Sequence, residues 1–227
     1  ANIVTHSLSK YADGHACSLG GIVVDKGDFD YEASGKFPGL TTPDESYHGL
    51  VYTKAFGNLA FTAKARAHVM RDFGMMISPM NAWLTNMNLE TLPLRMQKHS
   101  ENGMKLAEYL ASHPKVEWVE YPGLPDSPDA KLAKKYLKAC GGVMTFGPKG
   151  GRKAAEKLLN SLELAALVIH VADARTGVLH PASTTHRQLS DGEQRATGIL
   201  PELIRVSAGL EHIDDIIADF EQALAKI

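Results

Sequence analysis

The sequence predicts an α/β protein. Short apolar segments bounded by glycine, such as residues 20–25 (GGIVVD) and 141–147 (GGVMTFG), are typical of buried strands. Between the short apolar segments, longer stretches repeat apolar residues every three or four positions, which indicates helices with one buried face. With 227 residues, of which 44% are hydrophobic, the chain can bury one large core or two small ones.

Composition excludes several classes of function. The net charge is −2 and Lys and Arg form no run, so no nucleic-acid partner is expected. No stretch approaches the ~20 apolar residues of a membrane span, and no secretory signal is visible. The two cysteines, Cys17 and Cys140, are far apart in the sequence and fit a reducing compartment. We therefore expect a cytoplasmic protein that acts on small molecules.

The first residues place a lysine at the end of a strand. If residues 2–7 are extended, Ser7 and Ser9 share one face of the chain and Lys10 takes the other. A lysine attacks carbonyls only as the free amine, which desolvation or a neighbouring cation favours. Two hydroxyls beside an amine suit a ligand that carries both a phosphate and an aldehyde.

The next segments predict a strand, a loop and two helices. The apolar run 20–25 predicts a buried strand, and the turn-rich residues 26–50 predict a long loop. Periodicity predicts a helix over 51–71, ended by Gly74, and a second helix over 81–110. Pro93 lies inside the second helical pattern, where a missing backbone N–H predicts a kink or break.

The rest of the chain alternates strands and helices. Apolar and polar residues alternate in 116–121, which predicts a strand before the turn Pro122-Gly123. The remaining expected elements are, in order, a helix over 129–139, a strand over 141–147, a helix over 152–162, a strand over 201–211 and a helix over 212–227.

Three separate segments resemble motifs of one family. The first is similar to H-S-x-S/T-K-Y-x-x-G-H-x-x-x-x-G-G, the lysine signature of the cysteine/methionine-metabolism family of pyridoxal-phosphate enzymes. Residues 78–96 resemble the family's S-P-x-N-A-F/W-L … G-L-E-T-L-x-L-R-M passage, and residues 173–186 its D-A-K/R-S/T-x-V-x-H-P-A-S-T-T-H segment. The residues that match the lysine signature are His6, Ser7, Ser9, Lys10, Tyr11, Gly14, His15, Gly20 and Gly21.

The resemblance implies a specific fold. Residues 1–95 would be the last part of the large domain of a fold type I pyridoxal-phosphate-dependent transferase, with a mostly parallel sheet and the bridging helices. Residues 96–227 would form the smaller C-terminal α+β domain. The family's catalytic lysine lies near the middle of its chains, so we expect a C-terminal half whose partner is the missing N-terminal half. Family members are commonly homotetramers.

The resemblance also implies roles for individual residues. Lys10 would bind pyridoxal 5'-phosphate covalently and act as the catalytic base, while Ser7 and Ser9 would donate to the phosphate. Ser183, in H-P-A-S, would lie near the substrate carboxylate. Gly177 stands where many members carry a larger apolar residue.

Arg205 is a candidate on chemical grounds as well. It lies inside the apolar strand 201–211, where a guanidinium without a partner is costly, so it should meet an anion. The planar fork of arginine fits a carboxylate. In the family this position binds the α-carboxylate of the substrate.

The segment KFPGLTTPDESYHG resembles the corresponding sequence in the branch of the family that acts on O-acetylhomoserine with sulfide. We therefore expect O-acetyl-L-homoserine and sulfide, or methanethiol, to give homocysteine, or methionine, and acetate. Two alternatives stay open. One is a methionine γ-lyase or a cystathionine γ-synthase or lyase, and the other is an inactive fragment that needs its N-terminal half.

One cluster raises the question of a metal. His170, Asp173, His180 and His186 fall within seventeen positions. Their spacing matches neither H-E-x-x-H nor a zinc finger, so we expect no metal centre.

Overall fold

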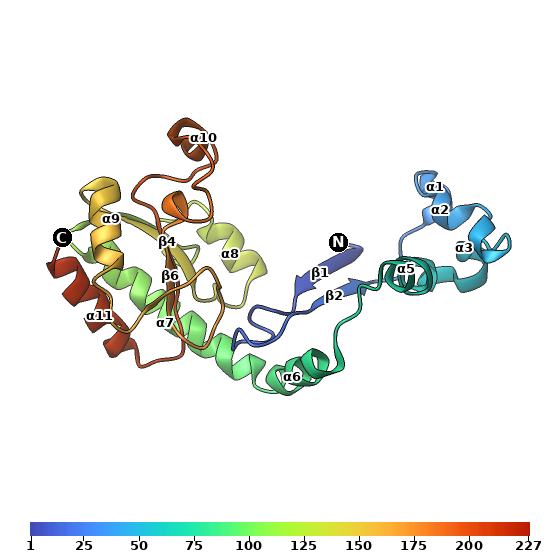
Figure 1. Ribbon diagram of the computed structural model, residues 1–227, viewed down its shortest axis with the longest axis horizontal. Helices are drawn as coiled ribbons and strands as arrows, with labels where there is room; N and C mark the ends of the chain where they lie inside the picture. Colours follow the sequence, from blue (N-terminus) through green and yellow to red (C-terminus); the bar gives the residue numbers. More distant parts are fainter. The chain divides into compact units, whose positions relative to one another are not determined.

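The computed structural model describes residues 1–227 and consists of two compact units (Figure 1). The N-terminal unit contains Ala1–Leu8 and Leu19–Leu84. The C-terminal unit contains Thr85–Ile227 together with Ser9–Ser18, the loop that carries Lys10. The expected domains, residues 1–95 and 96–227, are defined by the complete fold of the family and not by compact units within this chain. They stay a prediction.

The N-terminal unit contains one antiparallel pair of strands, β1 (Ile3–Ser7) and β2 (Gly21–Asp25). Both strands were expected, but the burial of β2 was not predicted correctly. Ile22, Val23 and Val24 are 45%, 50% and 51% exposed. The reason is that β1 and β2 form a sheet of their own and pack mainly against each other, so the faces of this sheet are left uncovered within the chain. The two strands of residues 1–84 are antiparallel to each other.

The helical part of the N-terminal unit is more broken than its periodicity predicts. The expected loop 26–50 contains three short helical turns, and the expected helix 51–71 is interrupted at Gly57, whose φ of 52° ends a helix. Gly74, with φ 67°, ends the last helix as expected. The elements are α1 (Tyr31–Ser34), α2 (Pro38–Thr41), the 3-10 helix η1 (Glu45–Tyr47), α3 (Tyr52–Phe56), the 3-10 helix η2 (Gly57–Leu59), α4 (Ala60–Lys64), the π-helical η3 (Ala65–Met70) and α5 (Arg71–Phe73).

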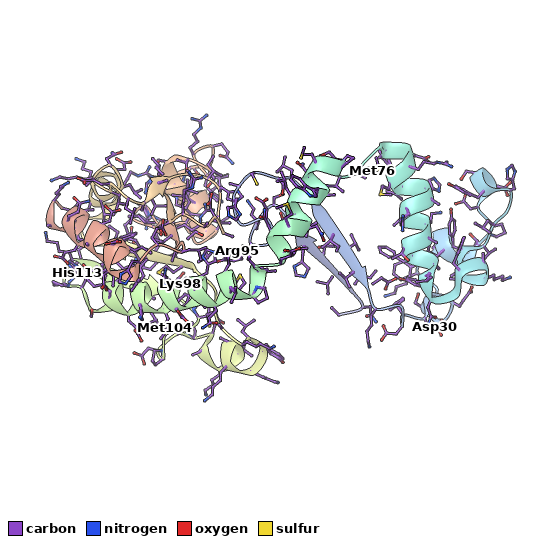
Figure 2. The ribbon with its side chains drawn as sticks, turned by 90° about the horizontal axis from the view of Figure 1, so that it is seen from below. Asp30, Met76, Arg95, Lys98, Met104 and His113 are labelled. Carbon is purple, nitrogen blue, oxygen red and sulfur yellow. The ribbon has the colours of Figure 1, made fainter.

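The helices α6 (Pro79–Leu89) and α7 (Leu92–Ser112) are separate, which confirms the break expected from Pro93. Proline occupies the first turn of α7, where its missing N–H has no intrahelical partner to lose. Figure 2 shows Arg95 near the beginning of α7 and His113 at its end.

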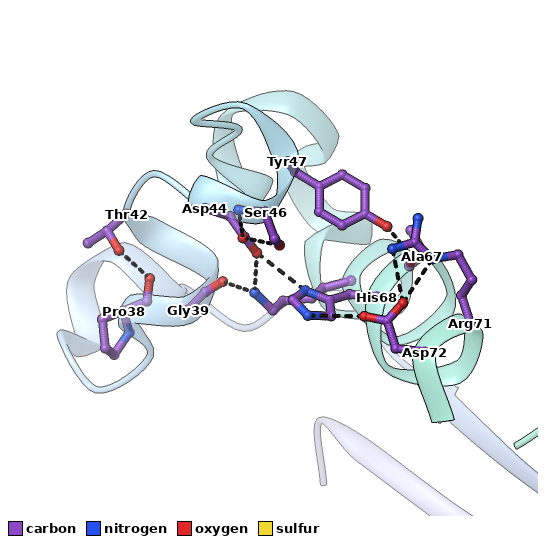
Figure 3. A network of polar contacts seen from close by, with 11 residues as sticks. Pro38, Gly39, Thr42, Asp44, Ser46, Tyr47, Ala67, His68, Arg71 and Asp72 are labelled. Carbon is purple, nitrogen blue, oxygen red and sulfur yellow. Dashed lines mark hydrogen bonds and ion pairs between the residues drawn. The ribbon is translucent and has the colours of Figure 1, made fainter. Parts of the chain in front are cut away.

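A polar network joins the loop 38–47 to the following helices (Figure 3). Asp44 accepts hydrogen bonds from the Lys64 ammonium at 2.7 Å and from the backbone N–H of Ser46 at 3.1 Å. These bonds, that of Lys64 first, hold the pKa of Asp44 well below its usual range. The ring nitrogens of His68 lie 3.4 and 3.5 Å from the carboxylates of Asp44 and Asp72.

The C-terminal unit is built on a five-stranded sheet with the order β3-β4-β7-β6-β5, antiparallel except between β5 and β6. Helices α7, α9 and α11 pack against this sheet (Figure 1). The hydrophobic core between the helices and the sheet includes Phe146, Ile204 and Phe220. The strands are β3 (Val116–Glu120), β4 (Val143–Pro148), β5 (Ala166–Leu167), β6 (Gly177–Leu179) and β7 (Ile204–Ser207). The helices are α8 (Ala130–Tyr136), α9 (Gly151–Leu159), the 3-10 helix η4 (Pro181–Ser183), α10 (Asp191–Ala196) and α11 (Ile213–Ala225).

The structure confirms every strand and helix expected after residue 115. It adds β5, β6 and α10, which are too short for a periodic signal. No helix has both the length and the apolar character that a membrane crossing requires.

Candidate active site around Lys10

The chain makes a tight turn directly after Lys10. The N–H of Gly14 donates to the Lys10 carbonyl at 2.8 Å. The Arg95 guanidinium donates to the carbonyls of Tyr11, at 2.7 Å, and Ala12, at 3.3 Å. Gly14 has φ 71°, a conformation that favours glycine. The turn is therefore held from outside by a side chain of α7.

Arg95 was not predicted, although it is the arginine of the quoted L-R-M motif. It is only 6% exposed. Its guanidinium also donates to the Asn88 carbonyl at 2.7 Å and to the Thr91 hydroxyl at 3.1 Å. Burial lowers the pKa of Arg95 and the charge of Asp13 opposes this. Arg95 thus connects the break between α6 and α7 to the turn after Lys10.

Asp13 organises the other side of the same loop. Its carboxylate is fully buried and accepts from the Cys17 N–H at 2.9 Å, the Ser18 hydroxyl at 2.8 Å and the Asn88 amide at 3.2 Å. Burial alone would raise the pKa of Asp13, but hydrogen bonds from Cys17, Ser18 and His15 together lower it to about 2. Asp13 is therefore ionised near neutral pH and fixes residues 13–18.

Tyr11 and Gly14 attach the loop to the segments that precede β4 and β6 in the C-terminal unit. The Tyr11 hydroxyl accepts from the N–H of Gly142 at 3.0 Å, and its ring packs edge-on against His99, with centroids 5.0 Å apart. Burial raises the pKa of Tyr11. The carbonyl of Gly14 accepts from the N–H of Ala174 at 2.7 Å. The Lys10 loop is thereby part of the unit that carries β7.

Arg205 extends from β7 and is partly buried. Its Nη2 donates to the Ile169 carbonyl at 2.6 Å and approaches the His170 carbonyl at 3.5 Å. Burial lowers the pKa of Arg205. The sequence predicts that the guanidinium meets an anion, but within this chain it meets backbone carbonyls and forms no ion pair. Its Nε and Nη1 form no hydrogen bond within the chain.

His170 lies beside Arg205, whose Nη2 approaches the His170 carbonyl at 3.5 Å. Burial, then the positive charge of Lys10, lowers the pKa of His170, and the charge of Arg205 acts in the same direction. The cations at residues 10 and 205 therefore act on the same imidazole. Sequence reasoning considered His170 only as a metal ligand and missed this position. No local pattern could have revealed it.

Gly177 of β6 keeps the segment 166–170 close to the sheet. A Cβ atom at residue 177 would lie 2.9 Å from Cγ2 of Val168 and 3.8 Å from the His170 carbonyl. A larger residue would push this segment away, together with the carbonyls that hold Arg205. The size of residue 177 therefore affects the position of the guanidinium.

The hydroxyl of Ser183 forms a hydrogen bond with the side chain of His180. The Ser183 hydroxyl lies 2.7 Å from Nδ1 of His180, and Nε2 of His180 lies 2.7 Å from the Pro201 carbonyl. Because a carbonyl only accepts, Nε2 carries the proton and Nδ1 accepts from Ser183. Both nitrogens of His180 are thus used by the protein. The role of Ser183 near a substrate carboxylate stays a prediction.

The two serines expected to bind phosphate belong to different units. Ser7 is the exposed last residue of β1, paired with Gly21, and Ser9 begins the part of the Lys10 loop that belongs to the C-terminal unit. Their donation to a phosphate stays a prediction.

Known proteins resemble this chain over nearly its whole length. Residues 1–225 match the model of the family described as Cys/Met metabolism PLP-dependent enzyme. The chain is 50% identical to the homocysteine synthase of Schizosaccharomyces pombe over 99% of its length, and 47% identical to the O-acetyl-L-homoserine sulfhydrylase of Leptospira meyeri over 100%. It covers 53% of each of these proteins, so it spans about half the length of the curated relatives it matches.

A solved structure agrees with the fold. The crystal structure of an O-acetylhomoserine (thiol)-lyase from Campylobacter jejuni, with N'-pyridoxyl-lysine-5'-monophosphate, superposes with a TM-score of 0.93 at 36% identity. The superposition covers 99% of this chain and 54% of that one. This chain belongs to the Cys/Met metabolism family of pyridoxal-phosphate-dependent enzymes.

Proposed function

We propose that this chain is the lysine-bearing half of an O-acetylhomoserine sulfhydrylase. The enzyme would convert O-acetyl-L-homoserine and sulfide, or methanethiol, into L-homocysteine, or methionine, and acetate. The observation that carries the proposal is that Lys10 and Arg205 lie in one compact unit, to which the N–H of Ala174 ties the Lys10 loop by donating to the Gly14 carbonyl at 2.7 Å. The names of the relatives, homocysteine synthase and O-acetyl-L-homoserine sulfhydrylase, support the choice of substrate.

The donor groups of this chain fit pyridoxal phosphate. Lys10 offers an amine for the aldehyde, and Ser7 and Ser9 offer hydroxyls for the phosphate. The buried Nε2 of His170 has no hydrogen-bond partner in the chain, as expected beside a site that is completed by a ligand. When bound, the cofactor supplies an electron sink for the carbanion chemistry of amino acids.

The side chains of the C-terminal unit then have separate tasks. The fork of Arg205 binds the α-carboxylate through two parallel hydrogen bonds, which fixes the orientation of the Cα–H bond. The Lys10 amine removes the proton from Cα as general base and returns it later. The turn held by Arg95 and Asp13 keeps the backbone of Lys10 in place for this transfer.

The N-terminal unit supports the proposal that the chain works in a larger assembly. Many of its large apolar side chains are exposed, as expected for a surface that another chain covers. We propose that the N-terminal half of the enzyme and further copies in a homotetramer cover them; this chain with that half is called the assembled enzyme below. Both cysteines are free thiols, which supports a cytoplasmic location. The exposed residues include Ile22, Val23, Val24, Leu59, Phe73, Met75, Met76, Met80 and Trp83.

The test is turnover by the assembled enzyme. O-acetyl-L-homoserine and sulfide should give homocysteine and acetate, and borohydride treatment should leave a pyridoxyl group on Lys10 by mass spectrometry. Lys10→Ala should lower kcat by at least about 1,000-fold, because no other amine takes its place. Lys131→Ala, which changes an exposed lysine of α8, is the matched control.

Two results would contradict the proposal. Release of ammonia and a ketoacid from methionine, without homocysteine formation, would indicate a γ-lyase. Full activity of Lys10→Ala would remove Lys10 from the reaction. Activity that appears only when the N-terminal half is added to residues 1–227 would support the assembly.

A further inference from the structure

His170 carries a polar atom that none of the roles above uses. Its Nε2 is shielded from solvent and has no hydrogen-bond partner. Such atoms are uncommon, because buried polar groups are nearly always paired. The carbonyls of Ile169 and His170 receive the Arg205 guanidinium at 2.6 and 3.5 Å. The imidazole therefore extends from the segment that positions the candidate carboxylate-binding group.

Four charged side chains act on this imidazole, the cations Lys10 and Arg205 and the carboxylates of Asp173 and Asp13. Both carboxylates are engaged elsewhere. Asp173 pairs with Arg175 at 3.1 Å, and Asp13 accepts hydrogen bonds within its own loop. Burial first, and then the charge of Lys10, lowers the pKa of His170, which favours the neutral imidazole in the chain without a ligand.

We propose that His170 takes up one proton from solvent when the carboxylate of an amino acid binds at Arg205, so that substrate binding is coupled to pH. The bound carboxylate adds a negative charge beside the imidazole and partly neutralises the positive charge of Arg205. The carboxylate favours the imidazolium form of His170, and Nε2–H then has an anion nearby to which it can donate.

The inference rests on the proposed function only in that the ligand is an α-amino acid.

The sign of the pH effect follows from proton linkage. His170 is neutral in the free site and protonated in the complex, so each binding event consumes a proton. Affinity is therefore highest at low pH and falls as pH rises through the pKa of His170 in the complex. One coupled proton can change the dissociation constant by at most about tenfold per pH unit.

The experiment measures binding of L-norleucine, which has the carboxylate but no γ-leaving group, to the assembled enzyme. Calorimetry in two buffers of different ionisation enthalpy counts the protons exchanged on binding. The wild type should take up more protons per norleucine than His170→Asn at pH 7.5. Its dissociation constant should rise roughly five- to tenfold more than that of the variant between pH 6.5 and 8.0. At pH 6.5 the variant should bind roughly tenfold more weakly, because it lacks the charged donor.

Two further variants separate this role from a structural one. His170→Gln should repeat the behaviour of His170→Asn. His212→Asn makes the same chemical change at an exposed histidine before α11 and should behave as the wild type. Equal proton uptake by the wild type, His170→Asn and His170→Gln would overturn the proposal. Because norleucine has no leaving group, the result does not depend on whether the enzyme makes homocysteine.

Discussion

Gly14 and Arg95 approach each other so closely that a Cβ atom at residue 14 would lie 2.1 Å from Nη1 of the guanidinium. Such a distance is far below van der Waals contact, so no other residue fits here unless Arg95 moves. The same guanidinium holds the carbonyls of Tyr11 and Ala12. The close approach therefore links the identity of residue 14 to the shape of the turn after Lys10.

Gly14→Ala should destabilise the assembled enzyme by about 2–3 kcal/mol, because the methyl group displaces Arg95 and φ of 71° is unfavourable for alanine. Urea denaturation measures the change. Gly192→Ala is the control, since no atom lies within 4 Å of its added Cβ and residue 192 is in α10. A variant at residue 14 as stable as the control would show that the turn tolerates the displacement.

Arg95→Lys should cost about 2–3 kcal/mol of stability, because an ammonium cannot reach the carbonyls of Tyr11, Ala12 and Asn88 together. The N–H of Gly14 donates to the backbone carbonyl of Lys10, and its hydrogen exchange should become faster as the turn loosens. Arg152→Lys, in an exposed pair with Asp191, should change stability by less than about 0.5 kcal/mol. Unchanged exchange at Gly14 would argue against the bracing role.

Asp13 should contribute to the acid limb of stability. Its pKa is lowered from 3.8 to about 2 in the folded protein, so the folded state favours the carboxylate. This contribution is complete above the unfolded pKa and is lost as pH falls from about 4 toward 2. Asp13→Asn should be less stable at neutral pH and show a flatter decline with acid, measured by denaturation at several pH values. An unchanged pH profile would exclude Asp13 as a contributor.

Arg205→Lys should raise KM for the amino-acid substrate roughly tenfold or more, since a point charge replaces a fork that binds a carboxylate through two hydrogen bonds. The effect on kcat should be smaller. Steady-state kinetics with the assembled enzyme measures both values. Arg187→Lys, at an exposed residue, should leave both unchanged. A loss of kcat at constant KM would assign Arg205 to another step.

Ala172→Gly should stabilise the protein by about 0.5–1 kcal/mol. Ala172 is buried and has φ 67°, where a Cβ atom is unfavourable, and its N–H donates to the Ser207 hydroxyl at 2.8 Å. Ala133→Gly, inside α8, should instead destabilise by about 1 kcal/mol. Thermal unfolding of the two variants compares the signs. A loss of stability at residue 172 would mean that its methyl contact outweighs the backbone strain.

Sequence patterns were sufficient where the signal lies in consecutive residues. Alternation predicted β3, periodicity predicted α11, and Pro93 and Gly74 marked helix boundaries as the structure has them. Patterns failed for the burial of β2. An apolar run shows that burial of the strand is favourable, but it does not show whether this chain provides the residues that bury it. Sequence patterns also missed the interruption at Gly57 of the helix expected over 51–71.

The sequence by itself determined the family, the lysine at the end of the first strand and the arginine of β7, because each is carried by residue types at short, fixed spacing. Only the tertiary structure decided which side chains meet. Arg95 braces a turn 84 positions away, and Arg205 of β7 donates to the Ile169 carbonyl. The physical reason is that local patterns report backbone preference and burial, whereas contacts between distant residues depend on how sheet and helices bring them together.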